Sequence, residues 1–307
     1  MPFELKILGA NSATPVYNRH QTSQLLQIEN EVFLIDCGEA TQHQLQKFKI
    51  RFNRINHIFI SHLHGDHYLG LPGLISTMHL NGRQKELYVY GPPGLDEILT
   101  IQFKYSQTFL TYKIIFQELD SARSYEILNL ENLTVQTIPL NHRIRCCGFL
   151  FKEKPKQRRI NKDRLPLNTS LLDIIALKNG EDIYKDGELI LKNEEYTHPP
   201  RKSRSYAYCS DTRYLEDILP IIKDVDLLYH ESTFLDELKS RAIETYHTTA
   251  LEAAIIAKKA NAGKLILGHF SSRYKELEPL LHEAKTVFTN SHLAIEGETF
   301  SISDEPL

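Results

Sequence analysis

The sequence predicts an α/β fold that carries a long inserted segment. Short apolar runs, which are typical of buried strands, alternate with helix-like segments in the first and last thirds of the 307 residues. Several of these runs end directly in His or Asp residues. Residues 151–204 interrupt the alternation with charged and proline-containing stretches. We therefore expect a single domain over residues 1–307 with an insertion at 151–204.

The composition narrows the class of protein. Hydrophobic residues make up 41% and charged residues 24% of the chain, as in ordinary globular proteins. The 36 Lys and Arg against 39 Asp and Glu give a net charge of −3, which excludes a protein that coats nucleic acid through bulk positive charge. No apolar run approaches the ~20 residues that span a bilayer, and the start does not resemble a signal peptide. We expect a cytoplasmic protein without membrane association.

The sparse cysteines also agree with a cytoplasmic protein. The four cysteines form no CxxC pair, so zinc-ribbon and thioredoxin-type motifs are excluded. We expect all four to be reduced and buried.

The elements before the insertion are mostly strands. Alternating or continuous apolar residues, stopped by Gly, Pro or polar clusters, predict strands at residues 5–8, 24–29, 32–35, 58–61, 87–90 and 135–140. Asn30-Glu31 between two of them is typical of a hairpin turn. Residues 96–103 are expected to form a helix.

After the insertion the α/β pattern returns. Thr248 or Thr249 is expected to cap an Ala-rich helix that reaches Ala260. The remaining patterns predict strands at residues 206–209, 227–229, 264–267 and 287–289, and helices at 215–223 and 277–284.

The inserted segment is basic where it begins. Residues 152–164 hold seven Lys or Arg and two Asp or Glu, a net charge of +5 in a net acidic protein. A second basic stretch covers residues 198–204, and a short helix is expected at 171–177. Such a segment could bind phosphates, although a charged run is also typical of a solvated loop.

A dense group of metal-binding residue types follows the strand predicted at 58–61. The sequence His62-Leu63-His64-Gly65-Asp66-His67 places four candidate ligands within six residues. Imidazole nitrogen together with carboxylate oxygen suits zinc. Neighbours on one loop cannot all close on one ion without strain. The spacing therefore favours two ions, with His62 and His64 at one and Asp66 and His67 at the other.

Three distant residues complete the candidate ligand set. His142, Asp211 and His269 each follow a predicted strand, so we expect them at the same edge as the first group. Taken singly, each could equally be a capping Asp or a core His. Together with the His62–His67 group they indicate a metal centre.

This arrangement resembles the metallo-β-lactamase superfamily, whose hallmark is HxHxDH followed by a distant His, Asp and His. Within it the chain resembles ribonuclease Z, the tRNA 3′-end processing endonuclease. The more specific elements are His230-Glu231-Ser232-Thr233-Phe234, His247-Thr248-Thr249-Ala250 and His269-Phe270-Ser271-Ser272-Arg273-Tyr274. The resemblance implies an αββα sandwich in which the insertion is a flexible arm.

The resemblance also implies roles for the site residues. One zinc ion would be held by His62, His64, His142 and Asp211, and a second by Asp66, His67, His269 and the bridging Asp211. Two such metals can hold a hydroxide between them and clamp a scissile phosphate.

Asp66 would act as the general base. His247, orientated by Glu231, would donate a proton to the leaving 5′ oxygen or stabilise phosphorane charge. The plain alternative is a helix-capping His beside a surface Glu.

Substrate contacts follow from the same resemblance. Ser271 and Arg273 would hold phosphate oxygens, although a structural salt bridge is an equally good reading of Arg273. The arm would grip the tRNA elbow, with Lys156, Arg158 and Arg159 as candidate phosphate contacts. Residues 165–170 do not contain the Gly-Pro element that arms of the family usually carry.

These observations together predict a zinc-dependent endoribonuclease that removes the 3′ trailer from precursor tRNA. The resemblance implies a tRNA 3′-hydroxyl and a 5′-phosphorylated trailer as products, and a homodimer as the active form. One alternative is a small-molecule phosphodiesterase or lactonase on the same fold, which a missing basic arm would favour. Another is a tRNA-binding protein without catalysis, which loss of a ligand or of His247 would favour. The sequence lacks none of these features.

Overall fold

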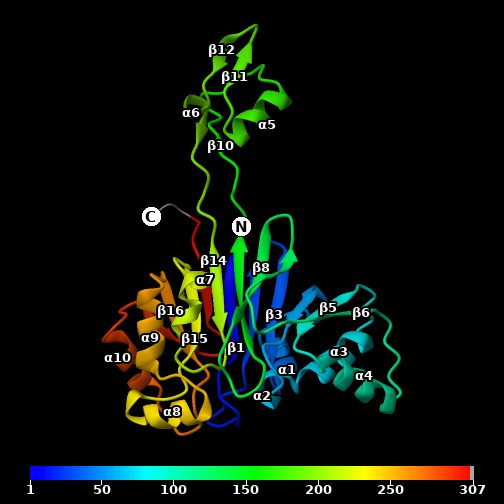
Figure 1. Ribbon diagram of the computed structural model, residues 1–307. Helices are drawn as coiled ribbons and strands as arrows, with labels where there is room; N and C mark the ends of the chain where they lie inside the picture. The colour runs from blue at the N-terminus through cyan, green and yellow to red at the C-terminus, as the bar shows by residue number, and fades with distance from the viewer. Residues whose placement is uncertain (305–307) are drawn as a thin grey trace.

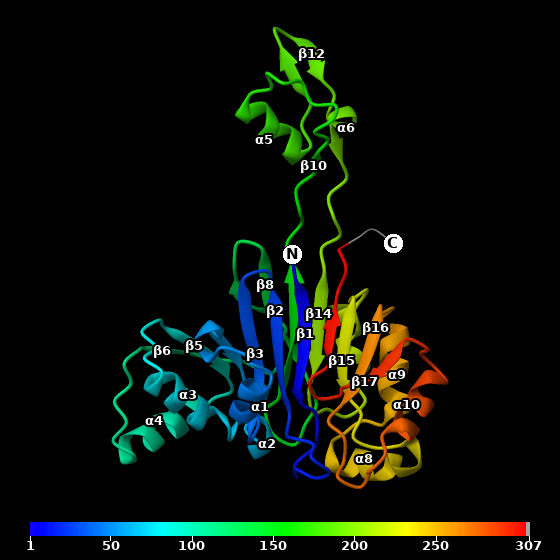
Figure 2. The ribbon, with the colours of Figure 1, turned by 180° about the vertical axis from the view of Figure 1, so that it is seen from behind.

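The chain forms two seven-stranded sheets packed face to face, with helices on both outer faces and a long arm at one end (Figures 1 and 2). The computed structural model describes residues 1–304. The predicted αββα sandwich is confirmed. No helix among these residues is both long and apolar enough to cross a bilayer.

The first sheet comes from the N-terminal third and the last strand. Its order is β18-β1-β2-β3-β4-β5-β6, with β3 to β6 parallel. The hairpin predicted at Asn30 joins β2 to β3. The bounds are β1 (Phe3–Gly9), β2 (Ser23–Ile28), β3 (Glu31–Cys37), β4 (His57–Phe59), β5 (Leu87–Gly91), β6 (Ile114–Glu118) and β18 (Thr299–Ser301).

The second sheet has the order β17-β16-β15-β14-β9-β8-β7. Strands β14 to β17 are parallel, and β9 runs antiparallel to both β14 and β8. The bounds are β7 (Glu126–Asn129), β8 (Leu133–Pro139), β9 (Cys147–Glu153), β14 (Ser205–Cys209), β15 (Leu227–Glu231), β16 (Lys264–Gly268) and β17 (Ser291–Leu293).

Aromatic side chains fill the space between the sheets. The Phe33 ring of the first sheet lies 5.4 Å from the Phe151 ring of the second, and Tyr208 stacks on Tyr229 at 5.1 Å. All four rings are buried, and such offset or tilted pairs add to the free energy of area burial. The four cysteines are also free and buried, as expected.

Helices cover the outer faces (Figure 1). The first sheet is covered by α1 (Thr41–Lys47), α3 (Leu71–Leu80) and α4 (Leu95–Tyr105), and the second by α9 (Ala250–Lys259) and α10 (Glu278–Lys285). The remaining sandwich helices are α2 (Gly65–Tyr68), α7 (Leu219–Ile222) and α8 (Lys239–Thr245), with 3-10 turns η1 (Phe52–Arg54), η2 (Glu216–Ile218) and η3 (Asp236–Leu238). The capping prediction for α9 is confirmed at Thr249, which forms a capping box with Glu252.

Two predicted elements differ in the structure. The helix expected at residues 215–223 is divided into η2 and α7, with Pro220 in the first turn of α7. The strand expected at 287–289 is wrong, because the turn that follows α10 occupies that region, with the backbone N–H groups of Val287 and Phe288 bonded to the Ala284 carbonyl. The edge strand forms instead at Ser291–Leu293, where it pairs with β16.

Four strands of the second sheet, β8, β14, β15 and β16, end at the same edge of that sheet. Parallel strands β14, β15 and β16 end at the same edge of the second sheet. Strand β8 shares their direction, because two antiparallel pairings separate it from β14. Residues that follow these strands therefore meet, although more than 120 positions separate His142 from His269.

The arm leaves the opposite end of the sandwich from α2 and α8 (Figures 1 and 2). Strand β9 runs on to Glu153, so residues 151–153 belong to the sheet and the arm spans 154–204. Its elements are β10 (Arg159–Ile160), α5 (Leu171–Asn179), β11 (Ile183–Lys185), β12 (Glu188–Leu191), α6 (Asn193–Tyr196) and β13 (Thr197–His198). Strand β10 pairs with β13, which joins the two connecting segments.

A buried ion pair anchors the arm where it meets the sandwich. Arg204 binds Glu153 through Nη2–Oε1 at 2.6 Å and Nε–Oε2 at 3.0 Å, and both side chains are at most 3% exposed. The same guanidinium donates to the Met1 and Ile302 carbonyls and lies over the Phe3 ring. Both chain ends of the sandwich are thus tied to the root of the arm.

Candidate metal centre

The His62–His67 group occupies the loop after β4 and the short helix α2. His64 is the extended residue before α2, and Asp66 and His67 lie in its first turn. His62 and His67 are fully buried, while Asp66 is 11% exposed. The helix turn therefore presents consecutive side chains toward the edge where β8, β14 and β16 end.

One set of donor atoms converges around His64. Its Nδ1 lies 3.1 Å from His62 Nε2 and 3.1 Å from His142 Nε2. Asp211 Oδ2 lies 3.6 Å from His62 Nε2 and 3.8 Å from His142 Nε2. All four ligand atoms fall within 4.8 Å of one another.

A second set lies on the other side of Asp211. His67 Nε2 and His269 Nε2 are 3.4 Å apart, and each is 3.5 Å from Asp66 Oδ2. Asp211 Oδ1 lies 3.4 Å from His67 Nε2 and 3.2 Å from His269 Nε2. The two oxygens of Asp211 thus face different sets.

These spacings fit tetrahedral metal sites. Zinc–nitrogen bonds of about 2.0–2.1 Å imply ligand–ligand edges of about 3.3–3.4 Å in a tetrahedron. The donor–donor distances in the two sets, 3.1–3.8 Å, lie around that value. The residues present therefore fit two ions that share Asp211.

Four of the five imidazoles are orientated by a partner on the ring nitrogen that points away from the cluster. Nδ1 of His62, His67, His142 and His269 lies 2.7–3.0 Å from a hydroxyl, carboxylate or carbonyl oxygen. Such bonds fix the tautomer that leaves Nε2 unprotonated as a ligand. The partners are, in order, Ser61, Asp36, the carbonyl of Tyr246, and Thr233.

Asp36 contacts the candidate metal centre, although the sequence analysis assigned it no role there. It is fully buried at the end of β3 and accepts hydrogen bonds from the backbone and hydroxyl of Ser61, from His67 and from Tyr208, at 2.5–2.8 Å. Its φ of 53° places it in the left-handed region. The separation in sequence between Asp36 and the His62–His67 group does not predict these contacts.

His247 and Glu231 form a pair beside the cluster. His247 Nδ1 lies 2.9 Å from Glu231 Oε1, and the ring packs 5.2 Å from that of His269. Glu231 is fully buried and also accepts from the backbone N–H of Thr212 and the hydroxyl of Thr233. The alternative of a surface Glu is therefore excluded.

Neighbouring charged groups lower the pKa of Glu231 and raise the pKa of His247. Burial raises the pKa of Glu231, but His247, His269 and Thr233 outweigh it and lower the pKa to about 2. Burial lowers the pKa of His247, but Glu231, Asp211 and Asp66 outweigh it and raise the pKa to about 9. At neutral pH the pair is an imidazolium and a carboxylate.

The carboxyl of Asp66 is also ionised. Burial raises its pKa, but His67 and His269 hold it far below the ordinary range. A carboxylate of this kind suits cation binding.

The predicted phosphate contacts lie in two separate places. Ser271 and Arg273 are on the loop after β16, beyond His269; Ser271 is buried and Arg273 is exposed. Lys156, Arg158 and Arg159 lie on the arm, at the opposite end of the sandwich from α2. Lys156 binds Glu153 at 2.8 Å and lies 3.6 Å from Asp304. The structure therefore does not bring the arm residues of this chain to its own metal cluster.

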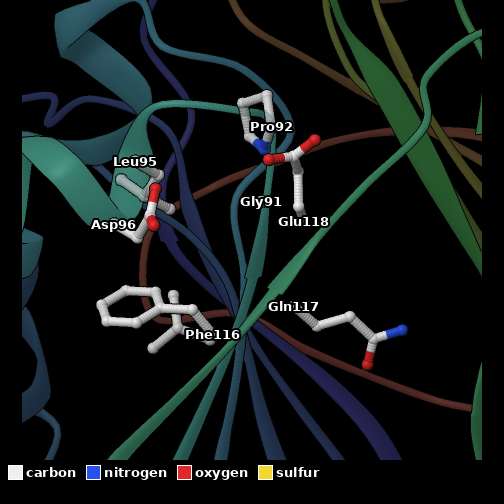
Figure 3. Close-up of a pocket in the computed structure, with 8 residues that line it drawn as sticks. Gly91, Pro92, Leu95, Asp96, Phe116, Gln117 and Glu118 are labelled. Carbon is white, nitrogen blue, oxygen red and sulfur yellow. The ribbon is translucent and has the colours of Figure 1, made fainter.

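A small pocket elsewhere contains none of the predicted site residues. It has a volume of about 90 Å³ and lies between β5, β6 and the start of α4, where Asp96 and Glu118 face it (Figure 3). It is separate from the candidate metal centre.

The chain is similar to known proteins over almost its whole length. Relatives named ribonuclease Z match almost the whole chain: that of Cytophaga hutchinsonii is 56% identical over 305 residues, 99% of this chain and 97% of the relative. That of Bacteroides fragilis is 46% identical over 302 residues, 98% of this chain and 99% of the relative. A family model described as Anti-Pycsar protein Apyc1 matches residues 3–202 and ends before Asp211, His247 and His269.

Solved structures show the same fold. The short form of human tRNase Z superposes with a TM-score of 0.72 at 27% identity, covering 98% of this chain and 99% of that one. The metallo-β-lactamase fold protein YhfI of Bacillus subtilis has a TM-score of 0.69 at 21% identity, covering 98% and 100%. The second likeness concerns the fold alone.

Proposed function

The chain belongs to the ribonuclease Z family, and over residues 3–202 also to the family described as Anti-Pycsar protein Apyc1; we propose that it is the endoribonuclease that removes the 3′ trailer from precursor tRNA. Membership of the ribonuclease Z family makes it a hydrolytic endoribonuclease. We propose a tRNA 3′-hydroxyl and a 5′-phosphorylated trailer as the products. The observation that carries the proposal is the cluster of seven candidate ligands beside the His247–Glu231 pair.

We propose two zinc ions per chain as the cofactor. His62, His64, His142 and Asp211 would hold one, and Asp66, His67, His269 and Asp211 the other. When bound, the pair would supply Lewis acidity toward the scissile phosphate and an acidic water that serves as the nucleophile. The histidine-rich, thiolate-free donor set with carboxylates suits zinc.

Asp66 is proposed both as a ligand and as the general base. Its low pKa supports the ligand role better, because a strongly acidic carboxyl holds a cation well and takes up a proton poorly. The backbone N–H of Ala13 donates to Asp66 Oδ2 at 2.8 Å and fixes that oxygen.

His247 is proposed as the proton donor. Glu231 occupies its Nδ1, so Nε2 remains for the substrate, and the ring is protonated at neutral pH. The expected leaving 5′ oxygen is wrong, because products with a 3′-hydroxyl and a 5′-phosphate require cleavage of the P–O3′ bond. We therefore propose that His247 donates to the leaving 3′ oxygen of the tRNA. Ser271 and Arg273 are proposed to hold phosphate oxygens from the loop after β16.

The active form is proposed to be a cytoplasmic homodimer in which one subunit's arm presents the tRNA to the site of the other. The arm and the metal cluster of one chain lie at opposite ends of the sandwich, which supports recognition by the partner's arm (Figure 1).

The deciding experiment is incubation with a 3′-extended precursor tRNA, with and without a chelator, followed by mapping of the product ends. Zinc-dependent cleavage that leaves the proposed ends supports the assignment. Binding of the RNA without cleavage would support the silent tRNA-binding alternative. Hydrolysis of small phosphodiesters alone would support the small-molecule alternative.

Elemental analysis tests the metal count separately. The wild-type protein should hold two zinc ions per chain, and Asp66→Ala should hold about one, because it lacks a ligand of the second set. One ion or none in the zinc-loaded wild type would contradict the dinuclear centre.

A further inference from the structure

The helix that precedes His247 ends at a residue in an unusual backbone conformation. Helix α8 stops at Thr245, and Tyr246 follows with a φ of 61° and a ψ of 46°, in the left-handed region. The N–H groups of Tyr246 and His247 close the helix on the carbonyls of Ile243 and Ala242, at 3.4 and 2.8 Å. Glycine is the usual residue at such a position, because a Cβ is strained there. A tyrosine in this place therefore needs a separate explanation.

The Tyr246 ring is stacked against Arg213. The Arg213 guanidinium lies 3.6 Å from the centre of the ring, and its Nε donates to the Ile243 carbonyl at 2.8 Å. In the seven other cation–aromatic contacts within residues 1–304, the cation lies 5.1–5.9 Å from the ring centre. The short distance places the guanidinium directly over the ring face, where its attraction to the aromatic quadrupole is strongest. The stack thus holds Tyr246 in its strained conformation.

The backbone of Tyr246 contacts the candidate metal centre. Its carbonyl oxygen lies 3.0 Å from Nδ1 of His142, and the next residue along the chain is His247. The rings of His142 and His247 lie 5.4 Å apart. Tyr246 is therefore fixed between a candidate ligand and the proposed proton donor.

Arg213 is fixed relative to the same centre. It follows the candidate ligand Asp211 by two positions, and the residue between them, Thr212, donates its N–H to Glu231 at 2.9 Å. Glu231 in turn bonds His247 through Nδ1. The Arg213–Tyr246 stack therefore joins the loop that carries Asp211 to the loop that carries His247.

We propose that Arg213 and Tyr246 are positioning residues for His247. This inference rests on the proposed function, since it takes His247 as the proton donor to the leaving 3′ oxygen. Glu231 holds the His247 ring through Nδ1 alone, so the ring would pivot about that bond if the end of α8 moved. The stack prevents this movement and keeps Nε2 within reach of the oxygen that takes its proton as the P–O3′ bond breaks. A displacement of about 1 Å can cost ~10²-fold in rate.

The test compares two substitutions that remove the same ring but differ in backbone strain. Tyr246→Ala and Tyr246→Gly both abolish the stack, whereas only glycine adopts the positive φ without strain. Tyr246→Phe retains the ring, and Arg213→Met removes the guanidinium from the other side of the contact. Lys264→Met is the matched control, because it removes a cation that lies over Phe300 at the start of β16, at the opposite end of that strand from the metal centre.

Single-turnover cleavage of a 3′-extended precursor tRNA is measured with saturating enzyme, together with KM, zinc content and urea denaturation. Tyr246→Ala, Tyr246→Gly and Arg213→Met should each lower the rate about 10- to 100-fold. The double variant of Arg213→Met and Tyr246→Gly should lose no more than either single variant, because both break one contact. Tyr246→Phe and Lys264→Met should match the wild type. All variants should keep the wild-type zinc content, and Tyr246→Gly should resist urea better than Tyr246→Ala.

A second substrate tests the proton transfer directly. In this precursor, sulfur replaces the bridging 3′ oxygen at the cleavage site, and a thiolate leaves without needing a proton. The Tyr246→Gly and Arg213→Met variants should cut it within about threefold of the wild-type rate.

Three results would overturn the inference. Equal losses on both substrates would show that the substitutions damage the metal site. Normal cleavage by Tyr246→Gly but not by Tyr246→Ala would show that only the backbone conformation matters. A rise in KM without a fall in rate for Arg213→Met would show that Arg213 binds a substrate phosphate instead.

His247→Ala separates this inference from the proposed function. If His247→Ala cuts the ordinary precursor at the wild-type rate, the proposed proton donor fails. If His247→Ala is impaired and Tyr246→Gly is not, only the positioning role fails.

Discussion

The chemistry at the residue scale depends on which nitrogen each imidazole presents. His62, His67, His142 and His269 all bond an outer oxygen through Nδ1, which directs Nε2 toward the cluster. His247 uses its Nδ1 in the same way but bonds a carboxylate that keeps it protonated. We therefore propose the same side chain as a metal ligand in one setting and as a proton donor in the other.

Replacement of His247 separates proton donation from metal binding. His247→Ala should keep both zinc ions and the fold but lose about 10²- to 10⁴-fold in kcat, because a positioned proton donor is removed. The exposed His43 provides a matched control, and His43→Ala should cleave precursor tRNA normally. Cleavage by His247→Ala at the wild-type rate would refute the donor role.

The pH profile tests the Glu231–His247 pair. The protonated form is the donor, so cleavage should fall as pH rises through the His247 pKa of about 9. In Glu231→Gln the carboxylate that raises this pKa is gone. The descending limb should therefore move down toward the ordinary histidine value of about 6.5. Profiles of kcat/KM for the two proteins measure the shift, and coincident limbs would show that Glu231 does not set the pKa.

At the element scale, the arm is an insertion between two strands of one sheet. Strands β9 and β14 are direct neighbours, and the chain between them leaves the sandwich and returns to the same place. The fold of the sheet therefore does not require the arm, whereas the arm requires the anchor at Glu153 and Arg204.

Removal of the arm should separate RNA recognition from phosphodiester chemistry. Replacing residues 157–200 with a short Gly-Ser linker leaves Glu153, Lys156 and Arg204 in place. The variant should retain two zinc ions and hydrolyse bis(p-nitrophenyl) phosphate normally. Its KM for precursor tRNA should rise sharply, because binding that is equal in ground and transition states is lost. Unchanged KM and kcat for precursor tRNA would mean that recognition lies elsewhere.

The anchor itself should be sensitive to loss of one partner. Arg204→Met leaves Glu153 buried without its main counter-ion and should lower the free energy of unfolding by about 3–5 kcal/mol in urea denaturation. Arg241→Met breaks a pair whose side chains are 51% and 66% exposed and should change it by less than about 0.5 kcal/mol. Similar values for the two variants would argue against a special role of the buried pair.

For the whole molecule, the important fact is that the arm and the candidate metal centre face opposite directions (Figures 1 and 2). A tRNA held by the arm of one chain is therefore presented away from that chain's own site. A partner chain in the reverse orientation would bring its own candidate metal centre toward the tRNA held by this arm.

Mixing two variants with different defects tests the partner arrangement. The arm-deleted chain keeps its site, and His247→Ala keeps its arm. After co-expression, mixed dimers should contain one complete combination of arm and site, and they should recover cleavage at low substrate concentration. The separately purified parents, assayed in one tube under conditions that prevent exchange, are the control. Failure of the mixed dimers to exceed that control would refute action across subunits.

The sequence by itself predicted the fold class, which is confirmed, and a set of candidate metal ligands. HxHxDH after an apolar strand supplied four candidate ligands, because a strand end and one helix turn place neighbouring residues together. Three further candidate ligands could be added, because parallel strands end at the same edge of a sheet. They are His142, Asp211 and His269. Capping of α9 was predictable for the same local reason, since the Thr249–Glu252 box spans three residues.

The tertiary structure alone decided contacts between residues that are distant in sequence. Asp36 reaches His67 and Tyr208 from a different strand, and no local pattern predicts that meeting. Lys156 was predicted as an RNA contact, but the fold places it against Glu153. Residues on the two segments of the arm have the same charges in the sequence. Only their partners in space distinguish cations that hold the arm from cations that have no carboxylate beside them, because a charge is neutralised by what the fold brings within a few ångströms of it.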